Sequence, residues 1–513
     1  MPHPSDAPGR RGAPAARLPG ARLLAAALAA ASLGALAFPA PAAAASAVPE
    51  RPVSAAELDR FAAGYVESTG LPGATVAVTL DGDVVHTGGY GRDGAGEPLR
   101  ADTPMRIASL SKSMTALAVM QLVEGGGVEL DRPVYDYLPD FRIADPRGAR
   151  ITVRQVLDQS SGMSDQGFSP VERPRRPESL AEALAQMEGA GLSADPGAEW
   201  EYHNPNYHVA ARLVEVVSGQ PFAEYLEEHV FAPAGMDDTS SLDPVTGTAP
   251  GLARGHVRAY GLNVPAPEPE VFGTGSGGVV STAEDMARWV ILQGGGGRTP
   301  DGTELVSAES VELMHRPSAP NGRYGLGWMR RPPQEGTDEV QVWHGGVVST
   351  YSSYQVLVPG TGYGFVALFN SGITLTEEDT WGLVEGLIAL TEGREPVVGD
   401  SWLWKVDLAF GALTLLALAL GTRGVLRAGG WAARRAGRPW WRTGLTVLPY
   451  LVPPALLLGV NGAITFVMGG REGTWLQRFY GVPAELAFLV AAALACLAVL
   501  AARAAAVVRA RRA

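Results

Sequence analysis

The chain has 513 residues, with 53 Asp+Glu against 41 Lys+Arg, a formal net charge of −12 and one cysteine, Cys496. This length exceeds that of one simple domain, and the acidic balance argues against nucleic acid or an anionic lipid surface as partner. The acidic surplus lies in residues 48–400, which hold 49 acidic and 24 basic residues. No cysteine falls there, so an exported domain over this range must be held by its own core.

The first 47 residues have the features of a secretory signal peptide. An apolar stretch runs from Leu23 to Ala37, and Ala45-Ser46-Ala47 offers a small-residue cleavage site. The stretch is short and alanine-rich for a membrane span. Basic residues precede it at Arg10, Arg11, Arg17 and Arg22. We therefore expect residues 1–47 to be a signal peptide, with an uncleaved N-terminal anchor as the alternative.

The next 350 residues or so predict strands at both ends and helices between them. Apolar alternation around Asp81-Gly82-Asp83 predicts a β-hairpin at the start. The expected strands are 74–80, 84–89, 340–344, 353–358 and 364–369. The expected helices are 109–124, 181–189, 207–218 and 377–390, and the Pro-rich stretch 263–270 is expected to be a loop. This order predicts an α/β fold of the α+β kind, with one antiparallel sheet built from both ends and a helical insertion.

Beyond residue 400 the composition changes to that of a membrane module. Three apolar runs, 402–420, 445–468 and 486–502, are each long enough to cross a bilayer as a helix. The connection after the first run and the C-terminal tail carry many arginines and no acid, which places both in the cytoplasm. The second connection is short and mixed, with Arg471, Glu472 and Arg478. An odd number of spans puts residues 48–400 outside, as the signal peptide also predicts, and anchoring is the simplest role for residues 401–513.

Lys112 is the only lysine in the first 404 residues, because the chain has two lysines and 39 arginines. Arginine stays protonated at any working pH, whereas lysine can be tuned to lose its proton. Ser109 lies three residues ahead of Lys112, so a helix start here places hydroxyl and amine on one face. A deprotonated amine could then activate Ser109 as a nucleophile. The plainer alternative is a solvated lysine on a helix surface.

Two more motifs follow in the chain. Tyr202-His203-Asn204 precedes a predicted helix, and His344-Gly345-Gly346 ends a predicted strand. With them come Ile151–Leu157 leading to Ser160-Ser161-Gly162-Met163, Gly277–Thr282, and Tyr324–Trp328. Together these motifs make residues 53–392 resemble the serine β-lactamase and penicillin-binding-protein superfamily, in its class C-like branch. The resemblance implies an antiparallel sheet flanked by helices, plus a helical subdomain.

The resemblance also implies roles for individual residues. Ser109 would be the nucleophile, Lys112 the amine that helps to deprotonate it, and Tyr202 a general base or proton relay. A phenol with its usual pKa of about 10 is a poor base at neutral pH, so it needs a nearby ammonium to stabilise its anion. Asn204 would orient Lys112 and the substrate amide. The backbone N–H groups of Ser109 and Val347 would form the oxyanion hole.

His344 departs from the lysine that β-lactamases carry at this position. A histidine is mostly neutral at pH 7, so the change argues against efficient β-lactam hydrolysis and predicts a pH-dependent preference for anionic substrates. His203 and His208 are five residues apart, which is wrong for one helical face, so neither a metal nor a cofactor is expected. Taken singly, Tyr202 could be an ordinary loop aromatic, Asn204 a helix cap and His344 a strand-end residue.

These observations favour a membrane-anchored extracytoplasmic serine hydrolase that forms an acyl-enzyme on Ser109. The substrate would be a small molecule or peptide with an amide, an ester or a D-amino-acid peptide bond. One alternative is a sensor module whose acylated serine does not turn over and whose spans report occupancy. Another is a noncatalytic domain that serves a membrane partner, against which the intact Ser, Lys, Tyr and Asn argue.

Overall fold

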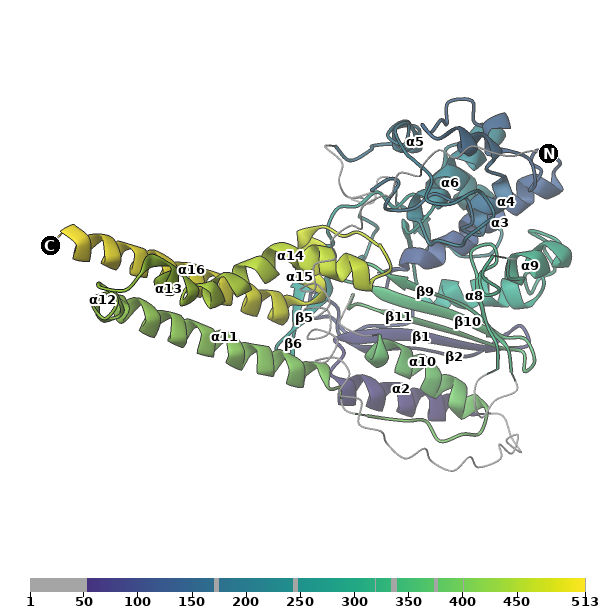
Figure 1. Cartoon of the computed structure of the whole chain (residues 1–513). Helices are drawn as coiled ribbons and strands as arrows, with labels where there is room; N and C mark the ends of the chain where they lie inside the picture. The colour runs from purple at the N-terminus through teal and green to yellow at the C-terminus, as the bar shows by residue number, and fades with distance from the viewer. Residues whose placement is uncertain are drawn as a thin grey trace, which may run out of the picture. The chain divides into compact units, whose positions relative to one another are not determined.

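The computed structural model describes residues 53–169, 175–242, 248–318, 320–333, 339–372, 377–399 and 401–512 (Figure 1). The predicted signal peptide, residues 1–47, lies outside this described part of the chain.

A six-stranded antiparallel sheet forms the centre of the domain, in the order β2-β1-β11-β10-β9-β8. Its strands are β1 (Gly73–Leu80), β2 (Asp83–Gly91), β8 (Met329–Arg331), β9 (Gln341–Val347), β10 (Ser352–Val358) and β11 (Tyr363–Phe369). The first strand pairs with the last, from Ala74 opposite Phe369 to Leu80 opposite Tyr363. The prediction of one antiparallel sheet built from both ends of the domain is therefore confirmed.

Helices cover both faces of this sheet (Figure 1). On one face, Val76 and Val78 pack in a hydrophobic core with α2 (Ala55–Thr69) and α10 (Glu378–Thr391). On the other face, Ala77 packs in a second core with α3 (Ser111–Glu124) and α8 (Ala283–Gly294). Successive side chains of a strand point to opposite faces, so one strand serves both cores. The layers are those expected for the α+β class.

The middle of the chain folds into a helical subdomain around α3 and α6 (Asn204–Ser218). Its other helices are short: α4 (Val153–Leu157), α5 (Leu180–Ala185), α7 (Phe222–Leu226) and α9 (Ala308–His315). Two small sheets accompany it, one of β3 (Met105–Arg106), β7 (Val279–Ser281) and β4 (Ser240–Ser241), the other of β5 (Gly255–Ala259) and β6 (Leu262–Ala266). The prediction of a loop over 263–270 is thus wrong at its start, where Val264 of β6 pairs with Val257 of β5 in the two-stranded sheet.

The C-terminal part contains three helices that are long and apolar enough to cross a membrane: 403–426, 448–467 and 483–510. The first is α11 (Leu403–Leu426), the second is a short 3₁₀ turn (Leu448–Leu451) followed by α14 (Val452–Val467), and the third is α16 (Pro483–Arg512). Shorter helices connect them: α12 (Ala428–Ala433), α13 (Trp440–Leu445) and α15 (Trp475–Gly481). Gly421 and Gly424 bring α11 close to α16, because a Cβ on either would lie 2.6 Å from a side-chain atom of Ala495 or Val499. Small residues commonly permit such close packing between membrane helices.

Candidate functional site

The Ser109 hydroxyl and the Lys112 amine meet where the chain turns from β3 into α3. Lys112 Nζ donates to Ser109 Oγ at 3.0 Å and to the carbonyl of Ser276 at 2.6 Å. Ser109 belongs to a 3₁₀ turn (Ala108–Leu110) in which Ala108 has a φ of 48°, in the left-handed region. Such strained backbone concentrates at functional sites. The structure therefore brings together the first two predicted site residues.

Lys112 is completely buried. Burial, and secondarily the positive charge of Arg471, hold the pKa of its amine well below the usual value. Desolvation disfavours the charged form of a lysine, so this environment favours the neutral amine. A neutral amine can accept a proton, which is the property that the lone lysine is expected to supply.

Tyr202 lies beside this pair. Its ring centroid is 4.9 Å from Lys112 Nζ, and its side chain hydrogen-bonds with Ser109. Burial raises the pKa of the phenol, while Arg471 and the Ser109 hydrogen bond oppose that rise. Trp200 and Tyr324 pack against the ring with centroid distances of 6.4 and 6.1 Å. The third predicted residue is thus within reach of the serine.

Asn204 is the first residue of α6, but it does not take the predicted place beside Lys112. Among the described residues no hydrogen bond joins the two side chains, and the Ser276 carbonyl holds the amine instead. The cap of α6 is His203, so Asn204 is not the helix cap either. Its Oδ1 is buried and has no partner in the described part of the chain.

The strand β9 brings Gly346 against the serine turn. A Cβ on Gly346 would lie 3.0 Å from the Ser109 nitrogen and 2.5 Å from the Ile107 carbonyl oxygen. Ser353 on the neighbouring β10 fixes this approach, because its hydroxyl donates to the same carbonyl at 2.7 Å. Only glycine fits such a contact. The predicted strand, expected to end at His344, continues through Gly345 and Gly346 to Val347.

His344 is buried within this strand, and its ring centroid lies 6.2 Å from that of Tyr202. Its Nδ1 lies 2.7 Å from the Gly345 carbonyl, which fixes the proton there, so Nε2 accepts from the Tyr324 hydroxyl at 3.2 Å. Burial and the nearby Lys112 lower its pKa to about 3. A lowered pKa keeps the imidazole uncharged in the neutral range, which argues against the predicted pH-dependent preference for anionic substrates.

Asp165 is a site residue that sequence reasoning missed. Its Oδ1 accepts from His203 Nδ1 at 2.8 Å, and its Oδ2 accepts from the backbone N–H of Glu472 at 3.1 Å. The sequence alone does not reveal this acidic partner of His203, which lies 38 residues earlier in the chain. His208 instead contacts Ser276 Oγ at 3.1 Å. Within the described ranges no group of three or more His, Cys, Asp or Glu side chains could hold a metal ion.

Arg471 is the other missed residue. Its guanidinium carbon lies 4.9 Å from the centroid of the Tyr202 ring, a cation–π distance. It comes from the connection between α14 and α15, more than 250 residues after Tyr202 in the sequence. No local motif surrounds it, so only the folded chain reveals the contact.

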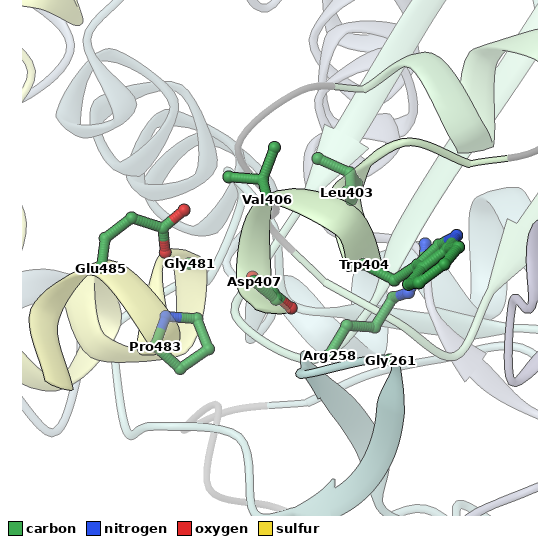
Figure 2. Close-up of a pocket in the computed structure, with 9 residues that line it drawn as sticks. All are labelled: Arg258, Gly261, Leu403, Trp404, Val406, Asp407, Gly481, Pro483 and Glu485. Atoms are coloured by element: carbon green, nitrogen blue, oxygen red, sulfur yellow. The ribbon is translucent and has the colours of Figure 1, made fainter. Parts of the chain in front are cut away.

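A separate small pocket lies away from these residues, where the β5–β6 hairpin meets α11 and α16 (Figure 2). The Asp407 carboxylate accepts there from the backbone N–H of Tyr260 at 2.7 Å. The lining residues are Arg258, Gly261, Leu403, Trp404, Val406, Asp407, Gly481, Pro483 and Glu485. None of them is a predicted site residue, so this pocket is a junction between parts of the chain.

In this site the Lys112 amine contacts the Ser109 hydroxyl, Tyr202 lies beside both, and Gly346 of β9 packs against the serine turn. On an α+β fold this arrangement is that of the serine acyl-transfer class. The chain belongs to the Beta-lactamase family, whose profile matches residues 58–389.

Individual relatives agree with this family. The chain is 30% identical over 314 residues to penicillin-binding protein 4 of Amycolatopsis lactamdurans, covering 59% of this chain and 82% of that protein. It is 27% identical over 305 residues to protein flp of Staphylococcus aureus (strain MW2), covering 58% of this chain and 60% of flp. The solved octameric penicillin-binding protein homologue from Pyrococcus abyssi is 27% identical, with a TM-score of 0.55 over 67% of this chain and 78% of that one.

Proposed function

We propose that this protein is a membrane-anchored serine hydrolase that forms an acyl-enzyme on Ser109. The observation that carries the proposal is the 3.0 Å contact between the Ser109 hydroxyl and the buried amine of Lys112. A serine is a weak nucleophile by itself and needs a base within hydrogen-bond reach. The low pKa of Lys112 makes its amine such a base.

In the proposed reaction Ser109 Oγ attacks the carbonyl carbon of an amide or ester. The hydroxyl proton passes to the Lys112 amine, directly or through the Tyr202 oxygen, and then to the leaving group as the carbonyl C–N or C–O bond breaks. Water then attacks the acyl-enzyme, which releases the acid and restores the serine. Tyr202 is suited to relay a proton because it contacts both partners.

The oxyanion of the tetrahedral intermediate would be held by the backbone N–H groups of Ser109 and Val347. Ser109 lies in the first turn of its helical segment, where N–H groups lack an acceptor within the helix. The close approach of Gly346 supports the pairing, because it places β9 at the Ser109 nitrogen. The unpartnered Asn204 Oδ1 and the Gly345–Gly346 strand would receive the substrate backbone.

For the whole chain we propose a signal peptide over 1–47, a hydrolase domain over 48–400 outside the cytoplasm, and an anchor of three membrane spans over 401–513. Three helices of sufficient length and hydropathy support the anchor. Arginines cluster after the first span and at the C-terminus, which supports a cytoplasmic position for both. The partners would then be membrane lipid and a small-molecule or peptide substrate.

The test is the intact mass of the detergent-solubilised full chain after exposure to a penicillin, a short nitrophenyl ester and a fluorophosphonate. The name of the Amycolatopsis lactamdurans relative supports penicillin as a probe. An adduct that is absent from Ser109→Ala would support the proposal. Ser113→Ala is the matched control, because the Ser113 hydroxyl donates to the Leu110 carbonyl, and it should keep the adduct. No adduct with any probe would refute the proposal.

A sensor whose serine is acylated without turnover is the second candidate. The contact of Glu472, from the membrane module, with Asp165 beside the site favours it. The lifetime of the adduct separates the two candidates. Loss of the added mass within minutes indicates a hydrolase, and an adduct that persists for hours indicates a sensor.

A further inference from the structure

The connection between the second and third candidate spans reaches the site around Ser109. It runs from the end of α14 to the start of α15 and contains Arg471 and Glu472. Two candidate spans separate this connection from the domain, so the proposed topology places both on the same side of the membrane. Its contact with Tyr202 is therefore consistent with the arrangement of the spans.

Hydrogen bonds hold the connection against the domain. The Glu472 backbone N–H donates to Asp165 at 3.1 Å, and the Ser169 hydroxyl donates to the Glu472 carboxylate. Asp165 in turn binds His203, the neighbour of Tyr202 in the sequence. The same short stretch of domain thus fixes both the connection and the tyrosine loop.

A second set of hydrogen bonds holds the connection within the membrane module. Arg478 is buried, and its guanidinium donates to the Arg471 carbonyl at 2.9 Å, to Thr465 at 3.1 Å and to Asn461 at 3.1 Å. The backbone of Arg471 is therefore fixed from both ends, while its side chain is exposed over the Tyr202 ring.

The Arg471 guanidinium is able to bind an anion. No carboxylate pairs with it among the described residues, and Glu472 beside it is engaged by Ser169. The other basic groups at the site do not offer a permanent charge: the pKa of Lys112 is held well below its usual value, and that of His344 is about 3. Arginine presents forked donors that match a carboxylate.

We propose that Arg471 is a specificity-determining residue, contributed by the membrane module, that binds a carboxylate of the substrate beside Tyr202. This inference rests on the proposed function and deepens it, because it names the residue that would recognise a substrate carboxylate. It also gives the three spans a part in the site beyond anchoring.

The experiment compares two probes of identical reactive group, a penicillin with its free carboxylate and the methyl ester of the same penicillin. The second-order rate of acylation of the full chain in detergent is followed by intact mass. Arg471→Gln should slow acylation by the free acid about tenfold or more and leave the rate with the ester within about twofold, since a charged hydrogen bond is lost only with the acid. Arg471→Lys should restore part of the rate with the acid.

Arg442→Gln is the matched control, because Arg442 is an exposed arginine of the same module, stacked on Trp441. It should leave both rates unchanged. Equal slowing of both probes by Arg471→Gln would show a merely structural role and overturn the inference, as would no change with either. If neither penicillin acylates the wild-type chain while the fluorophosphonate still modifies Ser109, the inference is overturned and the proposed function stands. If no probe reacts with Ser109, both fail.

Discussion

Gly346 and Ser109 approach so closely that a single methyl group on the glycine would lie 3.0 Å from the serine nitrogen. The contact joins β9, at the end of the domain sequence, to the turn that carries the hydroxyl. It also means that the serine backbone and the strand edge cannot move independently.

Gly346→Ala should therefore slow acylation of Ser109 about 100-fold, the usual cost of losing one oxyanion donor, because the methyl group pushes β9 from the Ser109 nitrogen. The rate with a fluorophosphonate, read by intact mass, checks this. Gly64→Ala is the control, since nothing lies within 4 Å of a Cβ there. An unchanged rate in Gly346→Ala would show that the strand does not build the oxyanion hole.

Lys112→Arg should reduce acylation about 1,000-fold although it keeps a basic side chain, because a guanidinium cannot accept the serine proton. In the wild-type chain the rate should rise with pH through the depressed pKa of Lys112 and level off below the usual lysine pKa. A pH–rate profile of acylation measures this. A rate that still rises up to pH 10 would contradict a lysine base of lowered pKa.

Acid should destabilise the domain through buried histidines. His208 is buried and its pKa is lowered to about 3, chiefly by burial. Below about pH 6.5 the unfolded chain therefore binds more protons than the folded one, and the free energy of unfolding falls as pH falls. For this histidine the loss between neutral pH and pH 5 is about 2 kcal/mol. His208→Gln should remove that part of the loss.

The measurement is denaturant unfolding of the solubilised chain at pH 7.5 and pH 5. Glutamine can keep the hydrogen bond to Ser276, so the variant should differ little from the wild type at pH 7.5. An equal acid-induced loss in both proteins would show that His208 does not titrate as described.

The proposed topology predicts which sites a membrane-impermeant maleimide can reach in intact cells. In a Cys496→Ala background, a cysteine at the exposed Glu188 of the domain should react, because it lies outside. A cysteine at the exposed Gly437, in the arginine-rich connection, should react only after permeabilisation. Reaction of the cysteine at position 437 in intact cells would contradict the proposed topology.

Local patterns were enough to predict the main elements. Alternation located the hairpin over 74–80 and 84–89 within a residue or two of β1 and β2, and the helix expected over 109–124 is the 3₁₀ turn followed by α3. Periodicity succeeds here because each element buries a face of its own sequence. The short strand β8 was missed because its three residues carry too little pattern and are held by pairing with Trp343, Val342 and Gln341.

The site was predictable only where a motif is contiguous. Ser109 and Lys112 sit one turn apart, so their contact follows from helix geometry. The carbonyl that actually holds the lysine belongs to Ser276, 164 residues away, and the acid that holds His203 is Asp165. Spacing along a chain gives no information on such partners, which is also why Asn204 was assigned a contact that it does not make.

The pairing of β1 with β11 has a consequence for how the protein is made. Thr79 donates to a backbone carbonyl of Gly364, 285 residues further on. A ribosome must therefore deliver almost the entire domain before β1 gains its second neighbour, and such distant closure is slow. The first apolar helix begins at Leu403, shortly after β11, so the sheet would close at about the time that the proposed anchor tethers the chain. In the proposed topology, folding of the domain and insertion of the first span would therefore compete in time.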